Sequence, residues 1–331
     1  MDQKYIPKNI LVTGGAGFIG SNLINFLLEK YDNINIYNID KLDYCSREKN
    51  VIFKKNYKFI KGNINQSDLI NYILNEYHID TIIHLAAQSH VDNSFGNSIE
   101  FTKDNILGTH NLLECCRIYN KIKKFIHIST DEVYGEVDDE STCCEKSLLN
   151  PTNPYAATKA GAEFLVKSYY KSFKLPVIIT RGNNVFGPRQ FPEKLIPKFI
   201  LALSNNEKCT IHGEGLSRRN FIYVDDVSNA IDIILCHGKV NEIYNIGTKN
   251  EYSVIDVTKN LMSKMLPNSN VNDIFNSLIT YVEDRNFNDY RYSISSEKLR
   301  TLGWKENVSF TDGLDKTIKW YLEFKDYWKN I

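Results

Sequence analysis

Five residues in two short segments of this chain could carry out acid–base chemistry together. The first segment supplies a hydroxyl and two adjacent carboxyls, Thr130, Asp131 and Glu132, and the second supplies Tyr155 and Lys159. A tyrosine is a poor base at neutral pH because its unperturbed pKa is near ~10. A nearby ammonium favours the phenolate, so we expect Lys159 to lower the pKa of Tyr155. Such a pair can move a proton during hydride transfer.

The tyrosine and the lysine lie at the start of a predicted helix. Asn153 offers a capping side chain and Pro154 suits the first helical position, so Tyr155 and Lys159 fall four residues apart on one helical face. A Tyr–Lys pair on a protein surface is common and indicates nothing by itself. Here the pair follows a glycine-rich turn and a series of strands, which favours a catalytic role.

The two carboxyls follow the apolar run 125–128, which predicts a strand. In open α/β sheets, ligands bind outside the carboxyl ends of the strands, where Thr130, Asp131 and Glu132 would lie. Thr130 can hydrogen-bond a substrate hydroxyl. Two adjacent carboxyls can take different roles if their environments separate their pKa values. A solvated acidic turn is the alternative, and the position at the end of a strand argues against it.

A glycine-rich turn near the start of the chain predicts a dinucleotide site. Gly14, Gly17 and Gly20 stand where the apolar run 10–12 gives way to a helical pattern. Glycine permits the tight turn, lets backbone amides approach a pyrophosphate and allows close helix–strand packing. Asp40 ends the second predicted strand, about 20 residues further on, where a carboxylate binds the adenosine ribose and repels a 2′-phosphate. The sequence therefore favours NAD over NADP, with a loop or capping aspartate as the alternative.

Asn63 follows the third predicted strand, and its amide oxygen could accept a hydrogen bond from the adenine amino group. It could equally be a plain turn asparagine. The residues expected to bind the cofactor are Gly14, Gly17, Phe18, Ile19, Gly20, Asp40, Asn63, Ile64, Leu85, Ala86, Ala87, Tyr155 and Lys159.

The composition limits the possible function classes. The chain has 331 residues and a formal net charge of +0, so it lacks the basic surface that binds nucleic acid or an anionic membrane. We find no membrane-spanning apolar run and no signal-peptide core near the N-terminus. The seven cysteines include no Cys-x-x-Cys, which indicates reduced thiols and a cytoplasmic protein. Without a His-Glu-x-x-His motif, we expect no metal site.

Strand and helix signals alternate over the first half of the chain, which predicts a Rossmann-type, doubly wound parallel α/β sheet. The predicted strands are 10–12, 34–39, 58–60, 81–85, 125–128 and 177–180, and the clearest helical patterns are 69–77 and 106–119. We assign residues 1–182 to an NAD-binding domain, with a return segment at about 221–247 whose strands 221–224 and 243–247 rejoin the sheet. Residues 183–331 form mainly a smaller, discontinuous mixed α/β substrate domain, interleaved with the first.

The chain resembles the extended short-chain dehydrogenase/reductase superfamily, and within it the nucleotide-sugar 4,6-dehydratases of the dTDP-glucose and UDP-glucose type. The resemblance runs essentially end to end, and the triplet 130–132 is its most specific motif. The segments that carry it are 13–22, 84–92, 129–135, 153–159, 187–197, 219–226, 244–247, 284–285 and 289–292.

The resemblance implies an NAD-dependent hydro-lyase that forms UDP-4-keto-6-deoxy-glucose from UDP-glucose in deoxy-sugar (rhamnose) biosynthesis. Carbon C4 is oxidised, water is lost across C5–C6, and the hydride returns to C6. Tyr155 would be the base at the 4-hydroxyl, assisted by Lys159 and Thr130. Asp131 would be the general acid at the departing 6-hydroxyl, and Glu132 the base at C5.

The resemblance also implies a nucleotide-sugar site and a homodimer. The residues that would bind the nucleotide sugar are Ser89, Asn184, Glu193, Lys194, Arg219, Asn245 and Arg285. Taken singly, the arginines could equally be surface ion-pair partners, although arginine and lysine suit a diphosphate. The helices near 104–119 and 155–173 would form the dimer interface.

The chain departs from the family pattern at two places. Residues 181–184 read Arg-Gly-Asn-Asn where the family usually has two small hydroxyl residues, and Asn63 replaces a typical aspartate. The C-terminal pattern resembles eukaryotic-type enzymes, which favours UDP-glucose, with dTDP-glucose as the alternative substrate. A nucleotide-sugar 4-epimerase or decarboxylase would leave Asp131 and Glu132 without a role, and a non-catalytic NAD-binding sensor would not need the complete catalytic set.

Overall fold

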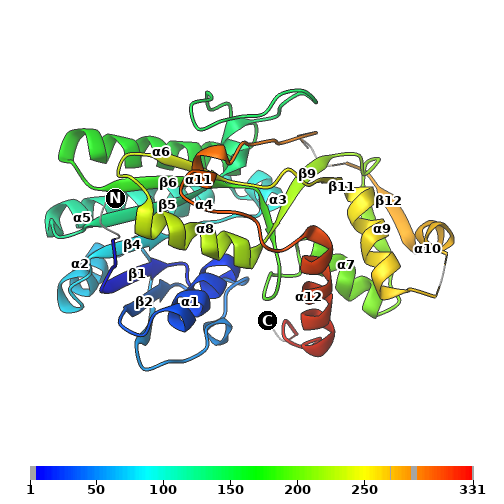
Figure 1. Ribbon diagram of the computed structural model, residues 1–331, viewed down its shortest axis with the longest axis horizontal. Coiled ribbons are helices and arrows are strands. Elements are labelled where there is room, and N and C mark those ends of the chain that lie inside the picture. The colour runs from blue at the N-terminus through cyan, green and yellow to red at the C-terminus, as the bar shows by residue number, and fades with distance from the viewer. Residues whose placement is uncertain (1–4, 269, 285–288, 330–331) are drawn as a thin grey trace.

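Apolar strands lie in parallel at the centre of the molecule (Figure 1). In the computed structural model, which describes residues 5–268, 270–284 and 289–329, seven strands form one sheet in the order β3-β2-β1-β4-β5-β6-β10. They are β1 (Asn9–Thr13), β2 (Asn35–Asp40), β3 (Tyr57–Lys61), β4 (Thr81–His84), β5 (Lys124–Thr130), β6 (Val177–Gly182) and β10 (Ile243–Ile246). The order reverses between β1 and β4, where doubly wound sheets bind their ligands. The predicted Rossmann-type fold is therefore confirmed.

Helices cover both faces of this sheet, because successive strand side chains point to opposite sides. Ile10 and Val12 pack toward α1 (Phe18–Lys30) and α8 (Val224–His237), whereas Leu11 packs on the other side. That side is covered by α2 (Ser67–Glu76), α5 (Gly108–Tyr119) and α6 (Pro154–Phe173). All three of these strand side chains are fully buried, and each contributes about 1.5–3 kcal/mol to folding.

Short helical segments follow the strands that border the predicted site. They are η1 (Glu48–Asn50), α3 (Val91–Gly96), α4 (Ser98–Phe101), the π-helical η2 (Thr102–Leu107) and η3 (Asp131–Tyr134). The segment η2 leads directly into α5, so the helix predicted over 106–119 begins with a π-helical turn. Such turns often occur at functional sites.

A smaller lobe stands beside the carboxyl ends of the strands (Figure 1). It holds a three-stranded sheet of β7 (Asn184–Phe186), β9 (Arg218–Tyr223) and β11 (Glu251–Ser253), and a parallel pair of β8 (Cys209–His212) and β12 (Ile279–Val282). Its helices are α7 (Leu195–Ser204), α9 (Val254–Met265), α10 (Val271–Leu278) and α12 (Phe310–Glu323), and α11 (Glu297–Arg300) lies against β10. Aromatic side chains such as Phe186, Phe199 and Phe310 fill the core of this lobe.

The return to the large sheet differs from the prediction in one strand. As predicted, β10 joins the sheet, beside β6. The expectation that residues 221–224 also rejoin it is wrong, because β9 pairs with β7 and β11, and Val224 already begins α8. The aromatic side chains of β9 pack on Phe186 and Phe310, so burial holds this strand in the small lobe.

Candidate active site

The glycine-rich turn forms a cradle, a concave stretch of backbone in which a side chain at Gly14 or Gly20 would clash with neighbouring backbone atoms. Gly14 has φ +72, and a Cβ there would lie 2.6 Å from the backbone nitrogen of Ala86. A Cβ on Gly20 would lie 2.5 Å from the carbonyl oxygen of Gly14. Gly17 is the N-cap of α1 without a capping side chain, so the first N–H groups of the helix face the cradle. This arrangement suits a pyrophosphate.

Every residue expected to bind the cofactor lines one cavity over the carboxyl ends of β1, β2, β4 and β5. Asp40 at the end of β2 accepts hydrogen bonds from the backbone N–H of Ala16 at 3.0 Å and of Leu42 at 2.8 Å. Burial raises the pKa of this carboxyl, and the two backbone donors oppose the rise. The side chain is thus held at the position where a ribose would lie.

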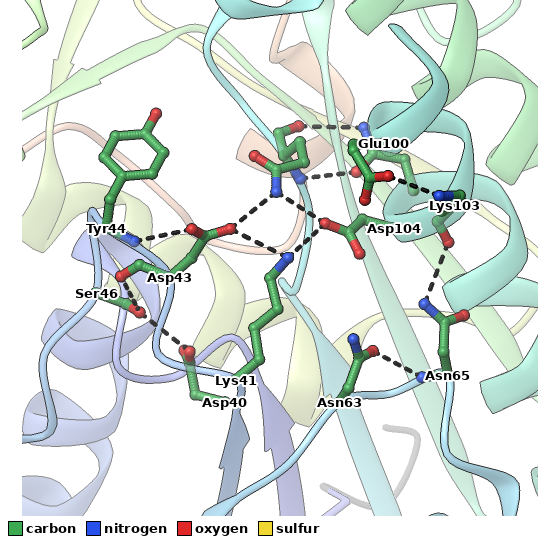
Figure 2. Close-up of polar contacts among 12 residues, drawn as sticks. Asp40, Lys41, Asp43, Tyr44, Ser46, Asn63, Asn65, Glu100, Lys103 and Asp104 are labelled. Carbon is green, nitrogen blue, oxygen red and sulfur yellow. Dashed lines mark hydrogen bonds and ion pairs between the residues drawn. The ribbon is translucent and has the colours of Figure 1, made fainter. Parts of the chain in front are cut away.

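Lys41 is balanced by two further carboxyls in the same cavity. Figure 2 shows its ammonium between Asp104, at 2.7 Å, and Asp43, at 3.1 Å. The Gln88 side chain donates to the same two carboxyls at 2.8 and 2.9 Å. Asp40 lines the same cavity and interacts electrostatically with Asp43, so three carboxyls and one ammonium lie at this end of the cavity. The surroundings of the ribose position are therefore net negative, which disfavours a 2′-phosphate.

Asn63 forms the hydrogen bond expected of a plain turn asparagine, which was the alternative to an adenine contact. Its Oδ1 accepts from the backbone N–H of Asn65 at 2.9 Å, as Figure 2 also shows. The residue nevertheless lines the cofactor cavity next to Ile64. A carbonyl oxygen has two lone pairs, so the turn leaves one acceptor site at Asn63.

The helix α6 begins as predicted and places Tyr155 and Lys159 in the site. Asn153 caps it by accepting from the N–H of Ala156 at 2.9 Å. Both reactive side chains are buried. The Lys159 ammonium donates to the carbonyl oxygen of Ile128 at 2.6 Å, and burial lowers the pKa of the ammonium to about 8. The site thus holds a lysine that can lose its proton near neutral pH.

The expected lowering of the Tyr155 pKa is not observed. Burial raises the pKa of this phenol above its ordinary value, and the neighbouring Glu132 adds to the rise. A hydrogen bond with Thr130 opposes it. Desolvation and the carboxyl therefore outweigh the Thr130 hydrogen bond, and the Lys159 ammonium contacts a backbone carbonyl instead.

The hydroxyl and the two carboxyls lie at the end of β5 in distinct surroundings. Thr130 caps η3 by accepting from the N–H of Glu132 at 3.3 Å. Asp131 is only 3% exposed, and burial raises its pKa to about 7, opposed by a hydrogen bond from Asn183. Burial also raises the pKa of Glu132, opposed by the charge of Arg219. Both carboxyls therefore stay protonated to a higher pH than an exposed carboxyl does. Such groups can exchange protons with a ligand.

A second cavity adjoins the first and carries most of the expected substrate residues. Thr130, Glu132 and Tyr155 line it, whereas the buried Asp131 lines neither cavity. The expected substrate residues that line it are Ser89, Asn184, Glu193, Lys194 and Arg219. Tyr155 lines both cavities. The reactive side chains thus stand where the two cavities meet.

The basic residues of this cavity are held by the backbone. Lys194 donates to the carbonyl oxygen of Ser89 at 3.0 Å. Arg219 donates to the carbonyl oxygen of Asp289 at 2.8 Å, and its guanidinium lies 4.6 Å from the ring centre of Tyr292. These contacts fix the direction of two cations toward the same cavity, as a diphosphate site requires.

Two of the expected substrate residues are not placed in the cavity. Asn245 lines neither cavity, because its side chain accepts from the Tyr134 hydroxyl at 2.9 Å and donates to the carbonyl oxygen of Ser295 at 3.1 Å. It is fully buried in this network. Arg285 lies outside the described residues.

Several polar residues that line the second cavity were assigned no role from the sequence, among them Asn183, His212, Asp289 and Tyr292. Asn183 belongs to the segment whose departure from the family pattern was noticed, so a signal for it existed. Asp289 and Tyr292 belong to the segment 289–292 that carries the resemblance, so a signal for them existed as well. His212 ends β8, and no motif marks it. The described part of the chain holds no group of three or more His, Cys, Asp or Glu side chains arranged to bind a metal ion.

Known proteins are similar to this chain over most of its length. A family model described as GDP-mannose 4,6 dehydratase matches residues 11–317. A dTDP-D-glucose 4,6-dehydratase of Dictyostelium discoideum is 50% identical, with 100% of this chain and 85% of that protein covered. A trifunctional UDP-glucose 4,6-dehydratase, 3,5-epimerase and reductase of Arabidopsis thaliana is 53% identical over 99% of this chain. This chain spans only 49% of that plant protein.

The solved structures agree. The dTDP-glucose 4,6-dehydratase DesIV of Streptomyces venezuelae, solved with NAD bound, superposes with a TM-score of 0.91 at 36% identity, over 97% of this chain and 99% of that one. The fold and the site thus define a member of the extended short-chain dehydrogenase/reductase superfamily. Within it, the chain belongs to the GDP-mannose 4,6-dehydratase family, whose members here are nucleotide-sugar 4,6-dehydratases. The predicted family and enzyme class, an NAD-dependent hydro-lyase, are confirmed.

Proposed function

We propose that this protein converts UDP-glucose to UDP-4-keto-6-deoxy-glucose, with dTDP-glucose as the alternative substrate. The observation that carries the proposal is the meeting of the two cavities at Tyr155, with Glu132 on the substrate side and the buried Asp131 next to Glu132 in the chain. Relatives named for each nucleotide are about equally similar to this chain. The plant relatives are named for two further activities, and this chain spans 49% of their length. We therefore leave the later steps of rhamnose formation to partner enzymes.

The cofactor cavity fits NAD because the glycine cradle leaves no room for a Cβ and Asp40 stands at the ribose position. When bound, NAD accepts a hydride and returns it. Gly14, Gly17 and Gly20 would hold the pyrophosphate, and Asp40 the ribose. The adenine would lie beside Asn63 and Ile64, and the nicotinamide end beside the residues that line both cavities.

The reactive side chains would act in sequence on one sugar. The positive charge of bound NAD would oppose the effect of burial and favour the phenolate form of Tyr155. In that form Tyr155, hydrogen-bonded to Thr130 and assisted by Lys159, takes the proton of the 4-hydroxyl as C4 is oxidised to a ketone. The ketone acidifies the C5 proton, which Glu132 removes. Asp131 gives its proton to the 6-hydroxyl, the C6–O bond breaks, and water leaves as the C5–C6 double bond forms. Protonation at C5 and hydride return to C6 then complete the methyl group.

The substrate would lie in the second cavity with its diphosphate between Lys194 and Arg219. Both cations are directed by backbone contacts, so little side-chain entropy remains to be lost on binding. Ser89, Asn184 and Glu193 would contact the sugar and phosphates from the same cavity. The buried network of Asn245 leaves it only a supporting role in this model of binding.

We propose an NAD-binding domain of residues 1–182 with a return segment at about 221–247, and a substrate domain of mainly residues 183–331. We also propose a homodimer. Ile118, Phe164 and Phe173 are at least half exposed on α5 and α6, and apolar side chains at such positions favour an interface. A cytoplasmic location agrees with the absence of disulfide bonds among the cysteines that the structure describes.

None of the helices in the described residues combines the length and the apolar character needed to cross a membrane.

A side-by-side rate measurement tests the function. Purified protein is incubated with UDP-glucose and with dTDP-glucose, and the products are identified by NMR. A 4-keto-6-deoxy sugar, formed faster from UDP-glucose, is the expected product. Faster turnover of dTDP-glucose would reassign the nucleotide, and UDP-galactose would replace the proposal with a 4-epimerase, which the fold alone would also support.

A further inference from the structure

The buried carboxyl Asp131 is held by one asparagine whose orientation is fixed. The Asn183 side chain accepts from the backbone N–H of Thr248 at 3.0 Å through Oδ1, and its Nδ2 donates to Asp131 Oδ2 at 2.7 Å. A backbone N–H can only donate, so the amide cannot flip without losing both hydrogen bonds. Asn183 is itself 5% exposed. The backbone at Gly247 runs so close that a Cβ there would lie 2.3 Å from Asn183 Oδ1.

The second carboxyl, Glu132, is held in the same manner. Asn153 accepts from the backbone N–H of Ala156 at 2.9 Å through Oδ1, and its Nδ2 donates to Glu132 Oε2 at 3.2 Å. Asn153 is also 5% exposed. The Asn153 side chain therefore both caps α6, the helix that carries Tyr155, and donates a hydrogen bond to the carboxyl of Glu132.

We propose that Asn183 and Asn153 are positioning residues, each using a backbone-locked amide to fix one of the two carboxyls, Asp131 and Glu132, in its working orientation. The inference rests on the proposed dehydratase function and extends it to residues outside the five that would react. Each amide donates to one carboxyl oxygen, so that oxygen is an acceptor. The proton of the acid form is thereby directed to the other oxygen, which for Asp131 is Oδ1. In the carboxylate form Oδ1 accepts from the Thr130 hydroxyl at 3.3 Å, and that hydroxyl can rotate to accept when Oδ1 is protonated.

The amide of Asn183 also affects the charge state of Asp131. An N–H donor stabilises the carboxylate and so opposes burial, which raises the pKa of Asp131 to about 7. The charged and titratable groups facing Asp131 are Glu132 beside it, Arg219 on β9, Tyr155 on α6 and Cys143 in the preceding loop. An acid with a pKa near the working pH can give up a proton and recover it in each cycle.

Two substitutions at position 183 test the first half of the proposal. Asn183→Ala removes the donor, and Asn183→Asp replaces it with a second carboxyl of the same shape. We expect kcat at neutral pH to fall roughly tenfold to a hundredfold with little change in KM, because the acid loses its orientation. The alkaline limb of the kcat–pH profile should move up by roughly one pH unit in Asn183→Ala, and further in Asn183→Asp. A purely structural role would leave the limb in place.

Two substitutions at position 153 separate capping from positioning. Serine is as good an N-cap as asparagine but carries no amide for Glu132. Asn153→Ser should keep the thermal unfolding temperature of the wild type, whereas Asn153→Ala should lower it. Both variants should slow elimination roughly tenfold and accumulate the 4-keto-glucose intermediate. Wild-type kinetics in Asn153→Ser would overturn this half of the proposal.

The matched control is Asn25→Ala on α1. Asn25 bridges the backbone in the same way, accepting from Ile52 at 2.8 Å and donating to the carbonyl oxygen of Asn50 at 3.0 Å, but it contacts no carboxyl. It should lose stability and keep its pH profile. If both position-183 variants behave like this control while the wild type makes the 4-keto-6-deoxy sugar, the positioning role of Asn183 is wrong. If the wild type itself makes no such product, the proposed function has failed instead.

Discussion

The Nζ atom of Lys159 lies 2.6 Å from the carbonyl oxygen of Ile128, so the buried ammonium of α6 is tied to the end of β5. This contact joins the two segments that supply the acid–base groups. The hydrogen bond partly compensates for the desolvation of the ammonium. Desolvation lowers the pKa of Lys159 and the negative charge of Glu163 opposes this, so that the pKa is about 8. The hydrogen bond therefore holds the Lys159 ammonium, whose burial destabilises the fold, beside the other acid–base groups.

We predict that Lys159→Met is inactive yet more stable than the wild type at neutral pH. The folded pKa of Lys159 is below its unfolded value, so the unfolded chain binds more protons and the ammonium destabilises the fold below about pH 8. That penalty, at most about 3 kcal/mol, fades as the pH rises from about 8 to about 10. Urea unfolding at several pH values measures it. A variant-to-wild-type difference that stays constant across this range would contradict the assigned pKa.

We predict that Tyr155→Phe folds normally and loses most of its turnover. The ring is buried and packs edge-on against Phe101 with centroids 6.3 Å apart, and phenylalanine keeps this packing. Only the hydroxyl is lost, and with it the base, which costs roughly a hundredfold to ten-thousandfold in kcat. Activity and thermal unfolding are measured together. Near-normal turnover with an unchanged unfolding temperature would remove Tyr155 from the mechanism.

The sequence predicted the parts of the site that depend on local geometry. The glycine turn, the strand ends and the capped start of α6 each follow from a few neighbouring residues, so Gly14, Asp40 and Tyr155 could be located. The position of β9 could not be predicted, because its apolar pattern fits either sheet and the choice is made by aromatic packing on Phe310. The pKa of Tyr155 likewise depends on burial, which spacing does not reveal.

The substrate side was predicted less well for a similar reason. Asn245 follows the family pattern, but its side chain is used inside the protein by Tyr134 and Ser295. Asn183 was noticed only as a departure from that pattern. Its contact with Asp131 spans a separation of 52 residues and requires β5 and β6 to be neighbours in the sheet. Contacts of this kind emerge only when the chain is folded.

We predict that the protein binds NAD at least roughly tenfold more tightly than NADP, because a 2′-phosphate would meet the carboxyls of Asp40, Asp43 and Asp104 around a single ammonium. Calorimetric titration of both cofactors measures the ratio. Asp40→Asn should reduce the preference for NAD over NADP, because this substitution removes one negative charge and keeps the shape of the side chain. Equal affinities in the wild type would remove the selectivity role of Asp40.

We predict that Lys194→Ala raises KM for the nucleotide sugar roughly tenfold or more and changes kcat little. The ammonium lies in the second cavity, held by the carbonyl oxygen of Ser89, and is assigned to the diphosphate rather than to the reacting carbons. Lys198→Ala on α7 is a control, because that exposed lysine lines neither cavity. A fall confined to kcat would show that Lys194 acts in the transition state.

The last prediction concerns the order of steps, which Glu132→Gln should interrupt. The amide keeps the shape of the side chain and its contact with Asn153, but it cannot take the C5 proton. Oxidation at C4 precedes that step, so the variant should stall with 4-keto-glucose and reduced cofactor on the enzyme, visible as NADH absorbance. In the wild type, substrate deuterated at C4 should give a product with deuterium in its methyl group, and heavy water should label C5. Deuterium recovered at C4, or normal turnover by Glu132→Gln, would replace the dehydratase with an epimerase-like reaction, because only elimination carries the hydride to a different carbon.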